Sequence, residues 1–256
     1  MKNKVNYIIS GVCFTLFIIL IVLLKTVDVG ESAIGHEIGL SHINLAVSEF
    51  TGVNDIWDKL TDIIAVFAVA VAAAFAVLGL VQLIKRKSIK KVDREILYTG
   101  GLYVVVVILY VLFEKVVINV RPIEAEASFP SSHTMVVCVI LGAAIPVLGK
   151  YIKNNSLCLS ARILCSALIL IAVIGRLISG VHWLTDICGA VLISGALVAL
   201  FAALPLPKNE EEPAAEAGQI TEKEQPAEEE TEEQTTEEQT TKEQTEEQIT
   251  KDTEEG

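Results

Sequence analysis

The sequence predicts an all-α protein, a bundle of six transmembrane helices followed by a disordered acidic tail. Six long apolar runs fill the first 207 residues, and outside them the charges of both signs are nearly balanced. Residues 208–256 instead hold 19 acidic and 4 basic side chains. We therefore expect two domains, a membrane domain at 1–207 and a cytoplasmic tail rich in Glu, Gln and Thr at 208–256.

The apolar runs match the thickness of a bilayer. The run at 5–24 holds 20 uncharged residues, and a helix of about 20 residues crosses the roughly 30 Å hydrocarbon core. The others lie at 63–84, 96–113, 135–149, 163–175 and 187–206. The fourth and fifth are short and need flanking residues, such as 131–134 and 160–162, to complete a span. A water-soluble helical domain is the alternative, but six such runs leave it too little polar surface.

The first run could instead be a cleaved signal peptide, because Lys2 and Lys4 precede it. It is longer than a signal core, and the sequence LLKTVDVGES that ends it offers no cleavage site with small residues. We expect a retained first span.

Basic residues indicate which side of the membrane is cytoplasmic. Six of the ten residues at 85–94 are Lys or Arg, and two more lysines lie at 150–155. If every run crosses once, these loops and both termini are cytoplasmic, and the opposite face holds residues 25–62, 114–134 and 176–186. We expect a multi-pass protein of the plasma membrane.

The first outer loop, 25–62, mixes apolar with polar residues, and we expect it to contain a helix lying along the membrane surface. His36 and His42 have no supporting ligands nearby, so we interpret them as ordinary loop residues rather than a metal site. The five cysteines lie in or beside the apolar runs, which indicates no exported disulfide framework.

The tail repeats with a period of five in the segment TEEQTTEEQTTKEQT. It lacks the apolar residues that could offset the entropy of ordering. We expect a disordered extension, with a transient charged helix as the alternative. The acidic excess belongs to the tail and says nothing of the membrane domain's substrate. We expect no nucleic-acid partner, and the sequence identifies no partner for the tail.

Two outer loops carry the polar groups that suggest chemistry. One holds Arg121 and then the sequence PSSH at 130–133, and the other holds Arg176, His182 and Asp186. Taken singly, each has an ordinary interpretation: a snorkelling arginine, a helix N-cap or an interfacial histidine. Polar groups at membrane depth are costly and usually functional. Their convergence on one face predicts an oxyanion site.

The residue types suit phosphate chemistry. Arginine presents a planar set of N–H donors that fits phosphate oxygens, and a helix beginning near Ser131 would offer free backbone N–H groups to an anion. His182 and Asp186 lie four residues apart, on one face of a helical turn. Asp186 can hold one imidazole nitrogen while the other attacks phosphorus. His133 can protonate the departing oxygen.

With these motifs, the sequence resembles the type-2 phosphatidic acid phosphatase superfamily of membrane lipid phosphatases. Its pattern is Lys, six residues, Arg-Pro; then Pro-Ser-Gly-His; then Ser-Arg, five residues, His, three residues, Asp. The resemblance covers residues 1 to about 207, with the motifs between the third and fourth and between the fifth and sixth spans. Three positions depart from the pattern: Glu114 stands where the lysine is expected, with Lys115 one residue late; Ser132 replaces glycine; and Gly175 replaces serine.

The resemblance implies a role for each residue. His182 would be the nucleophile that forms a phosphohistidine, Asp186 would orient it, and His133 would be the general acid. The phosphate would be held by Arg121, Arg176, Ser131 and Ser132, with Lys115 as a helper. No carboxylate cluster offers a metal site, so we expect neither a metal nor another cofactor.

The expected function is hydrolysis of a lipid phosphate or diphosphate at the outer membrane face. Substrates of this kind include undecaprenyl diphosphate, phosphatidic acid and phosphatidylglycerol phosphate. Two alternatives stay open. One is transfer of a phosphoryl or head group between lipids, and the other is an inactive protein that binds or transports lipids. The second would be expected to lose His133 or His182, and both are present.

Overall fold

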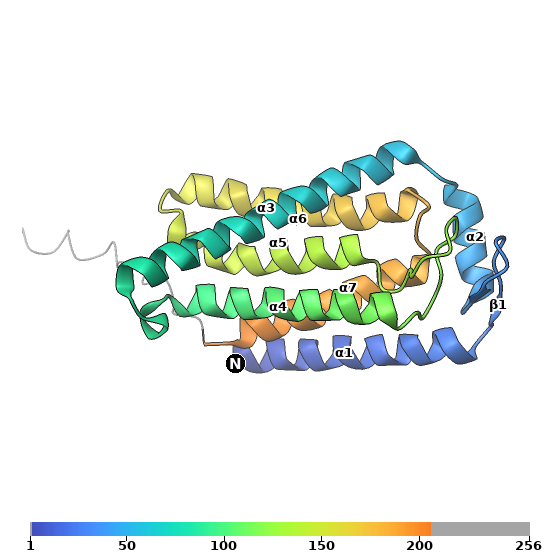
Figure 1. Cartoon of the computed structure of the whole chain (residues 1–256), viewed down its shortest axis with the longest axis horizontal. Helices are drawn as coiled ribbons and strands as arrows, with labels where there is room; N and C mark the ends of the chain where they lie inside the picture. Colours follow the sequence, from blue (N-terminus) through green and yellow to red (C-terminus); the bar gives the residue numbers. More distant parts are fainter. Residues whose placement is uncertain (1, 206–256) are drawn as a thin grey trace, which may run out of the picture. The chain divides into compact units, whose positions relative to one another are not determined.

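The computed structural model describes residues 2–205 and confirms the all-α class (Figure 1). Within this range, six helices are long and apolar enough to cross a membrane, which confirms the six predicted spans. They are α1 (Lys2–Thr26), α3 (Asp55–Arg86), α4 (Arg94–Lys115), α5 (Ser132–Tyr151), α6 (Asn155–Ile178) and α7 (Leu184–Ala203). The predicted tail at 208–256 and the domain boundary at 207 lie outside the described residues.

The two short apolar runs are completed by polar residues at their starts. α5 begins at Ser132, where the side chain of Ser131 accepts a hydrogen bond from the N–H of Thr134. α6 begins at Asn155, eight residues before its apolar run, and the side chain of Asn154 accepts from the N–H of Leu157. Such caps satisfy N–H groups that a helix leaves free at its first turn.

α3 also begins eight residues before its apolar run, so the predicted outer loop is shorter than 25–62. The side chain of Asn54 caps α3 by accepting from the N–H groups of Ile56 and Trp57. The polar first turns of α3 therefore belong to the helix and lie at the mouth of the bundle.

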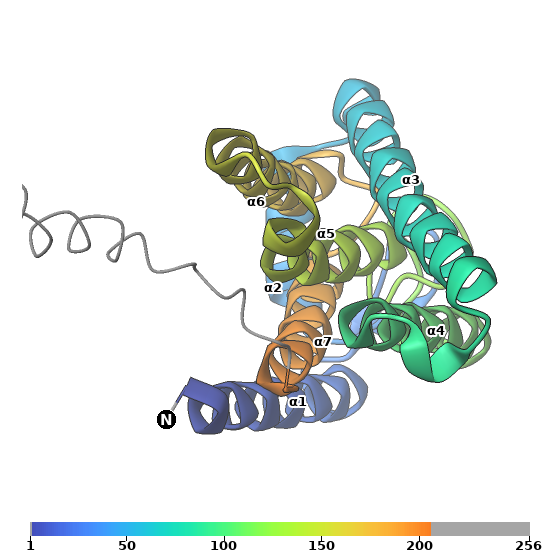
Figure 2. The same cartoon turned by 90° about the vertical axis from the view of Figure 1, so that its left-hand side faces the viewer.

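The bundle is built around α5 and α7 (Figure 2). About half of their apolar windows is buried, 56% and 50%, compared with 11–22% in the other four helices. α5 packs against α3, α4, α6 and α7, and α1 packs along α7. The outer faces of the remaining helices are exposed and apolar, as expected for helices that contact lipid.

The segment between α1 and α3 forms a small cap over one end of the bundle. It contains an antiparallel pair, β1 (Gly30–Glu31) and β2 (Glu37–Ile38), followed by helix α2 (Ser41–Thr51). The buried side chain of Asn44 donates to the hydroxyl of Thr185 and accepts from its N–H, which fixes α2 on the start of α7. A helix thus occurs in the expected loop; its placement along the membrane surface stays a prediction.

The loops divide between the two ends of the bundle (Figure 1). The loop from α4 to α5 and the loop from α6 to α7 lie at the same end as α2. The connection from α3 to α4, which includes the short 3-10 helix η1 (Ile89–Lys91), lies at the other end with the start of α1. Both polar motifs therefore meet at one end, opposite the basic segment 85–94.

Phe129 anchors the loop that leads into α5. Its ring is buried, stacks on Phe17 with centroids 5.7 Å apart and meets the edge of Phe113 at 6.3 Å. On the α7 side it lies against Gly189, where a Cβ atom would stand 2.3 Å from the ring. A glycine is required here because α7 and the ring approach so closely.

We expect Gly189→Ala to destabilise the protein, because the added methyl group must displace Phe129 from its aromatic cluster. Overpacking typically costs about 1–3 kcal/mol. The matched control is Gly11→Ala in α1, where nothing lies within 4 Å of the new atom and alanine is the better helix former by about 1 kcal/mol. Thermal melting of both variants in detergent checks this, and equal melting temperatures would contradict the packing described for Gly189.

Candidate functional site

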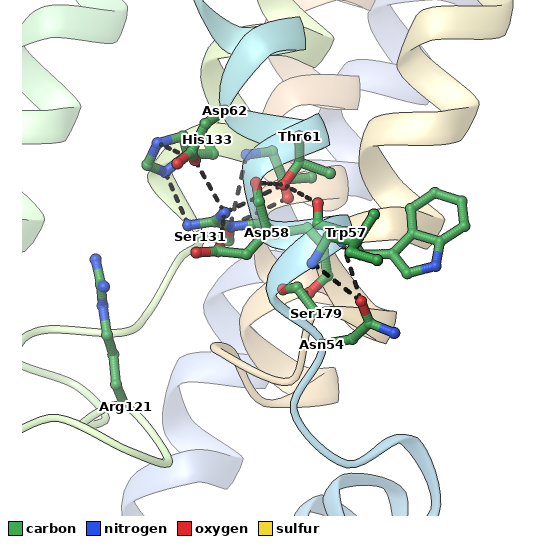
Figure 3. Close-up of polar contacts among 12 residues, drawn as sticks. Asn54, Trp57, Asp58, Thr61, Asp62, Arg121, Ser131, His133 and Ser179 are labelled. Carbon is green, nitrogen blue, oxygen red and sulfur yellow. Dashed lines mark hydrogen bonds and ion pairs between the residues drawn. The ribbon is translucent and has the colours of Figure 1, made fainter.

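The candidate site lies where α3, α5 and the α6–α7 loop meet, at the end of the bundle that α2 covers (Figures 1 and 3). It consists of two groups of side chains. One surrounds His182 and the start of α7. The other surrounds Arg176, near the end of α6.

His182 is buried and held on one side. Its side chain is 1% exposed, and its Nδ1 lies 3.6 Å from Oδ2 of Asp186 and 3.4 Å from the hydroxyl oxygen of Ser128. Ser128 donates to Asp186, and so does the backbone N–H of Trp183, at 2.9 Å. Asp186 therefore serves both the histidine and the first turn of α7. Nε2 of His182 is buried and has no hydrogen-bond partner among the described residues.

The surroundings of His182 favour a neutral imidazole. Burial lowers the pKa of His182 below its ordinary value, and the contact with Asp186 offsets this only in part. The positive charges of Arg176 and Arg121 lower the pKa further. A neutral imidazole has a free electron pair on one ring nitrogen, and the nitrogen with no partner is Nε2.

Arg176 forms the centre of the second group. Its side chain is 4% exposed, and one nitrogen, Nη1, contacts Asp58 at 2.6 Å, Asp62 at 3.1 Å and Thr61 at 3.2 Å. The other, Nη2, lies 3.3 Å from Nδ1 of His133. Figure 3 shows Asp58, Thr61 and Asp62 of α3 beside His133 of α5.

Arg121 lies on the α4–α5 loop and stands apart from His133 and Asp62 (Figure 3). Its Nη1 is 3.2 Å from Glu124 and 3.6 Å from Glu126, both of which are exposed. Its Nε is buried and has no partner in the part of the chain that the structure describes. The guanidinium is thus paired only with carboxylates that are themselves exposed.

The two serines of the second motif have different surroundings. Ser131 is fully buried and caps α5 through its side chain, while its N–H donates to the carbonyl oxygen of Asp186 at 3.1 Å. Ser132 is half-buried and lines the cavities described below. The side chain of Ser132 therefore faces the cavities, whereas that of Ser131 is used to cap α5.

Lys115 does not join the site. It is exposed at the end of α4 and lines neither cavity, whereas Glu114 lines both. The position at which the family pattern has lysine thus presents a carboxylate to the cavities.

A cavity of about 900 Å³ opens beside His133 and Arg121. Its polar lining comes from these two residues, Ser132 and three carboxylates, and its apolar lining comes from α3, α4 and α5 through Ala65, Val66, Val69, Tyr110 and Val136. A second cavity of about 10 Å³, roughly the room that one water needs, lies beside His182 and Ser128. The two cavities share Tyr110, Glu114, Ala127 and Ser132.

Gly175 explains how α3 approaches Arg176. A Cβ atom on Gly175 would lie 2.8 Å from the ring of Trp57 and 2.9 Å from the methyl group of Thr61. The absence of a side chain lets α3 and α6 pack closely, one residue before the arginine. The serine of the family pattern would not fit this packing.

Sequence reasoning missed Asp58, Asp62 and Ser128. The two aspartates lie four residues apart, and therefore on one face of α3, but the span was expected to begin only at residue 63. The Asn54 cap followed by acidic residues was the available signal for an earlier start. Ser128 carried no signal of its own, because its role depends on contacts with Asp186, 58 residues away.

Two histidines and two arginines thus lie at one end of a six-helix membrane bundle, and this part of the chain is similar to known proteins. The model of the PAP2 superfamily matches residues 113–210, the part of the chain that holds all three motifs. Over these residues the chain is similar to the PAP2 superfamily.

A solved structure shares the fold. It is described as the first transmembrane PAP2 type phosphatidylglycerolphosphate phosphatase from Bacillus subtilis, is 18% identical and superposes with a TM-score of 0.53. The similarity covers 76% of this chain and 94% of that one. No curated protein sequence matched the chain.

We expect the ring of His182 to stay neutral at a pH below the ordinary midpoint for histidine, since burial disfavours the charged form. In Asp186→Asn the midpoint should fall further, because the carboxylate that favours the imidazolium is gone. NMR of protein with isotope-labelled histidine checks both, with His182→Gln used to assign the signal. A midpoint at or above the ordinary value, or a rise in Asp186→Asn, would contradict the assigned surroundings.

Proposed function

We propose that the protein is an integral membrane phosphatase that hydrolyses a lipid phosphate or diphosphate through a phosphohistidine intermediate. The observation that carries the proposal is His182, whose Nε2 is buried and unpartnered among the described residues while Nδ1 faces Asp186. A nucleophile held by an orienting carboxylate, with its reactive nitrogen free, is the arrangement that covalent catalysis needs.

The reaction would proceed in two steps. In the first, Nε2 of His182 attacks phosphorus, the bond from phosphorus to the lipid oxygen breaks, and the departing oxygen takes a proton from His133. In the second, water attacks the phosphohistidine and returns a proton to His133, which frees phosphate and His182. Asp186 would stabilise the imidazolium that forms as the new bond develops.

The charge on the transferred phosphoryl group would be balanced by the protein itself. Arg176 and Arg121 supply two permanent positive charges, and the start of α5 at Ser132 supplies backbone N–H groups and the positive end of a helix dipole. Such preorganised donors are the usual source of transition-state stabilisation for an oxyanion. We therefore propose that the reaction needs no metal ion.

The large cavity supports a lipid as substrate. It joins charged residues, among them Arg121 and His133, to an apolar wall contributed by α3, α4 and α5. A phosphate head group fits the first part and a hydrocarbon chain the second. Phosphatidylglycerol phosphate, on which the named Bacillus protein acts, undecaprenyl diphosphate and phosphatidic acid all have this division, so a phosphate-release panel with these three lipids is the way to distinguish them.

For transfer to occur, the phosphate must reach Nε2 of His182 from the large cavity. The small cavity at His182 holds room for about one water, and it shares four lining residues with the large one. We propose that the two cavities join when substrate binds, by movement of the shared side chains Tyr110 and Ser132. The lipid would then enter through the large cavity, on the side that α3 and α4 line.

We also propose that the site faces away from the cytoplasm. The basic segment 85–94 lies at the end of the bundle opposite both motifs (Figure 1), and basic loops stay cytoplasmic. The site would then act on lipids in the outer leaflet of the plasma membrane, with both termini inside.

The proposal predicts a trappable phosphoenzyme. His182→Ala should abolish both phosphoenzyme and turnover, while His133→Ala should slow phosphoenzyme formation by about 10²–10⁴-fold, less with a good leaving group. Rapid quenching of purified protein with labelled substrate in excess EDTA measures acid-labile, base-stable phosphate. Normal phosphoenzyme in His182→Ala would overturn the assignment of the nucleophile, and activity that appears only with added magnesium would overturn the metal-independent mechanism.

The carboxylate of Glu114 should weaken phosphate binding. We expect Glu114→Gln to lower KM for a lipid phosphate by on the order of fivefold, since two like charges about 4 Å apart repel by about 1 kcal/mol in water. Lys115→Gln is the matched control, because the neighbouring residue lines neither cavity, and its KM should stay near that of the unaltered protein. An unchanged KM in Glu114→Gln, measured in mixed micelles, would show that the carboxylate does not face the bound phosphate.

A further inference from the structure

His133 is contacted at both of its ring nitrogens. Nε2 lies 3.2 Å from a carboxylate oxygen of Asp62, and Nδ1 lies 3.3 Å from Nη2 of Arg176. A guanidinium has only donors, so Nδ1 must accept from Arg176. The hydrogen of the neutral ring is therefore on Nε2, the nitrogen that faces Asp62.

We infer that Asp62 is a positioning residue for the general acid, which gives each histidine of the site its own carboxylate. This inference rests on the proposed function. Asp186 faces Nδ1 of His182 and leaves Nε2 free, whereas Asp62 holds Nε2 of His133 and leaves Nδ1 on the side of Arg176. The two histidines thus use opposite nitrogens: His182 attacks through Nε2, and His133 protonates the leaving oxygen through Nδ1.

The position of Arg176 explains how binding of the substrate would lead to protonation of His133, the general acid. Without an anion, the guanidinium directs an N–H at Nδ1, and a positive charge there opposes protonation. A phosphate that enters between Arg176 and His133 accepts from the guanidinium and releases Nδ1. The carboxylate of Asp62 on the far nitrogen then favours the imidazolium, which takes its proton from solvent.

The proton balance follows from this placement. During phosphoryl transfer the proton on Nδ1 passes to the lipid oxygen as its bond to phosphorus breaks, and that electron pair stays on the oxygen. His133 is left neutral, with its remaining hydrogen on Nε2, the nitrogen that faces Asp62. When water attacks the phosphohistidine, its proton returns to Nδ1, and the cycle needs no other proton carrier.

Asp58 provides an internal comparison. It lies one turn earlier on the same face of α3 and contacts Nη1 of Arg176 at 2.6 Å. Asp62 contacts the same nitrogen at 3.1 Å and His133 as well. Asp58 therefore represents a counter-ion of Arg176, and Asp62, one helix turn later, represents a partner of the general acid. Substituting each in turn distinguishes the two roles.

The test compares kcat for an alkyl phosphate and an aryl phosphate, because only the poor alkyl leaving group depends on general acid help. Asp62→Asn should lower kcat for the alkyl substrate by roughly tenfold or more and affect the aryl substrate much less. Asp58→Asn should alter KM, because it unpairs the guanidinium, and should leave the ratio of the two kcat values unchanged. Asp62→Glu should recover part of the loss.

A double variant closes the test. If Asp62 acts through His133, Asp62→Asn should add little to the defect of His133→Ala, since effects of residues that act as a unit are not additive. Equal slowing of both substrates in Asp62→Asn, the same change of ratio in Asp58→Asn, or full additivity with His133→Ala would each overturn the inference. Thermal melting identifies a variant that fails to fold, in which case Asp62→Glu carries the comparison. A wild-type protein that cleaves neither substrate would refute the proposed function itself.

Discussion

The buried guanidinium of Arg176 is the constraint that organises this end of the molecule. A charge at membrane depth is costly unless it is paired, and the partners of Arg176 come from two other helices, α3 and α5. α3 can approach α6 closely here because Gly175 leaves room for Trp57 and Thr61. The helix packing and the anion site therefore depend on the same few contacts.

The first turns of α3 organise both histidines. Asp62 contacts His133, and about two turns earlier, at the cap of α3, the N–H of Asn54 donates to the carbonyl oxygen of Ser179, in the loop that carries His182. A substrate phosphate would compete with Asp58 and Asp62 for Arg176, so in the proposed function the carboxylates that pair with Arg176 also set how tightly an anion binds. The contacts of α3 would therefore affect both the stability of the fold and the affinity for an anion.

Much of this could be predicted from the sequence, because hydrophobic length predicts spans and short motifs bring their own geometry. The six spans were predicted, and the structure brings Arg176 to His133 and Asp186 toward His182. The side chains that α3 contributes to the site, Asp58 and Asp62, could not be predicted. The apolar run shows where the helix enters the hydrocarbon and not where the helix begins. Ser128 and the exposed position of Lys115 depend on tertiary contacts and on the direction of single side chains, which spacing alone does not determine.

The central claim is that Nε2 of His182 receives the phosphoryl group, and locating the phosphate on the protein tests it most directly. Phosphoenzyme trapped during turnover can be digested under basic conditions, its labelled peptide sequenced by mass spectrometry and the substituted nitrogen identified by NMR. We predict a phosphate on His182 at Nε2, because Nδ1 faces Ser128 and Asp186. Phosphate on His133, or on Nδ1 of His182, would contradict the account.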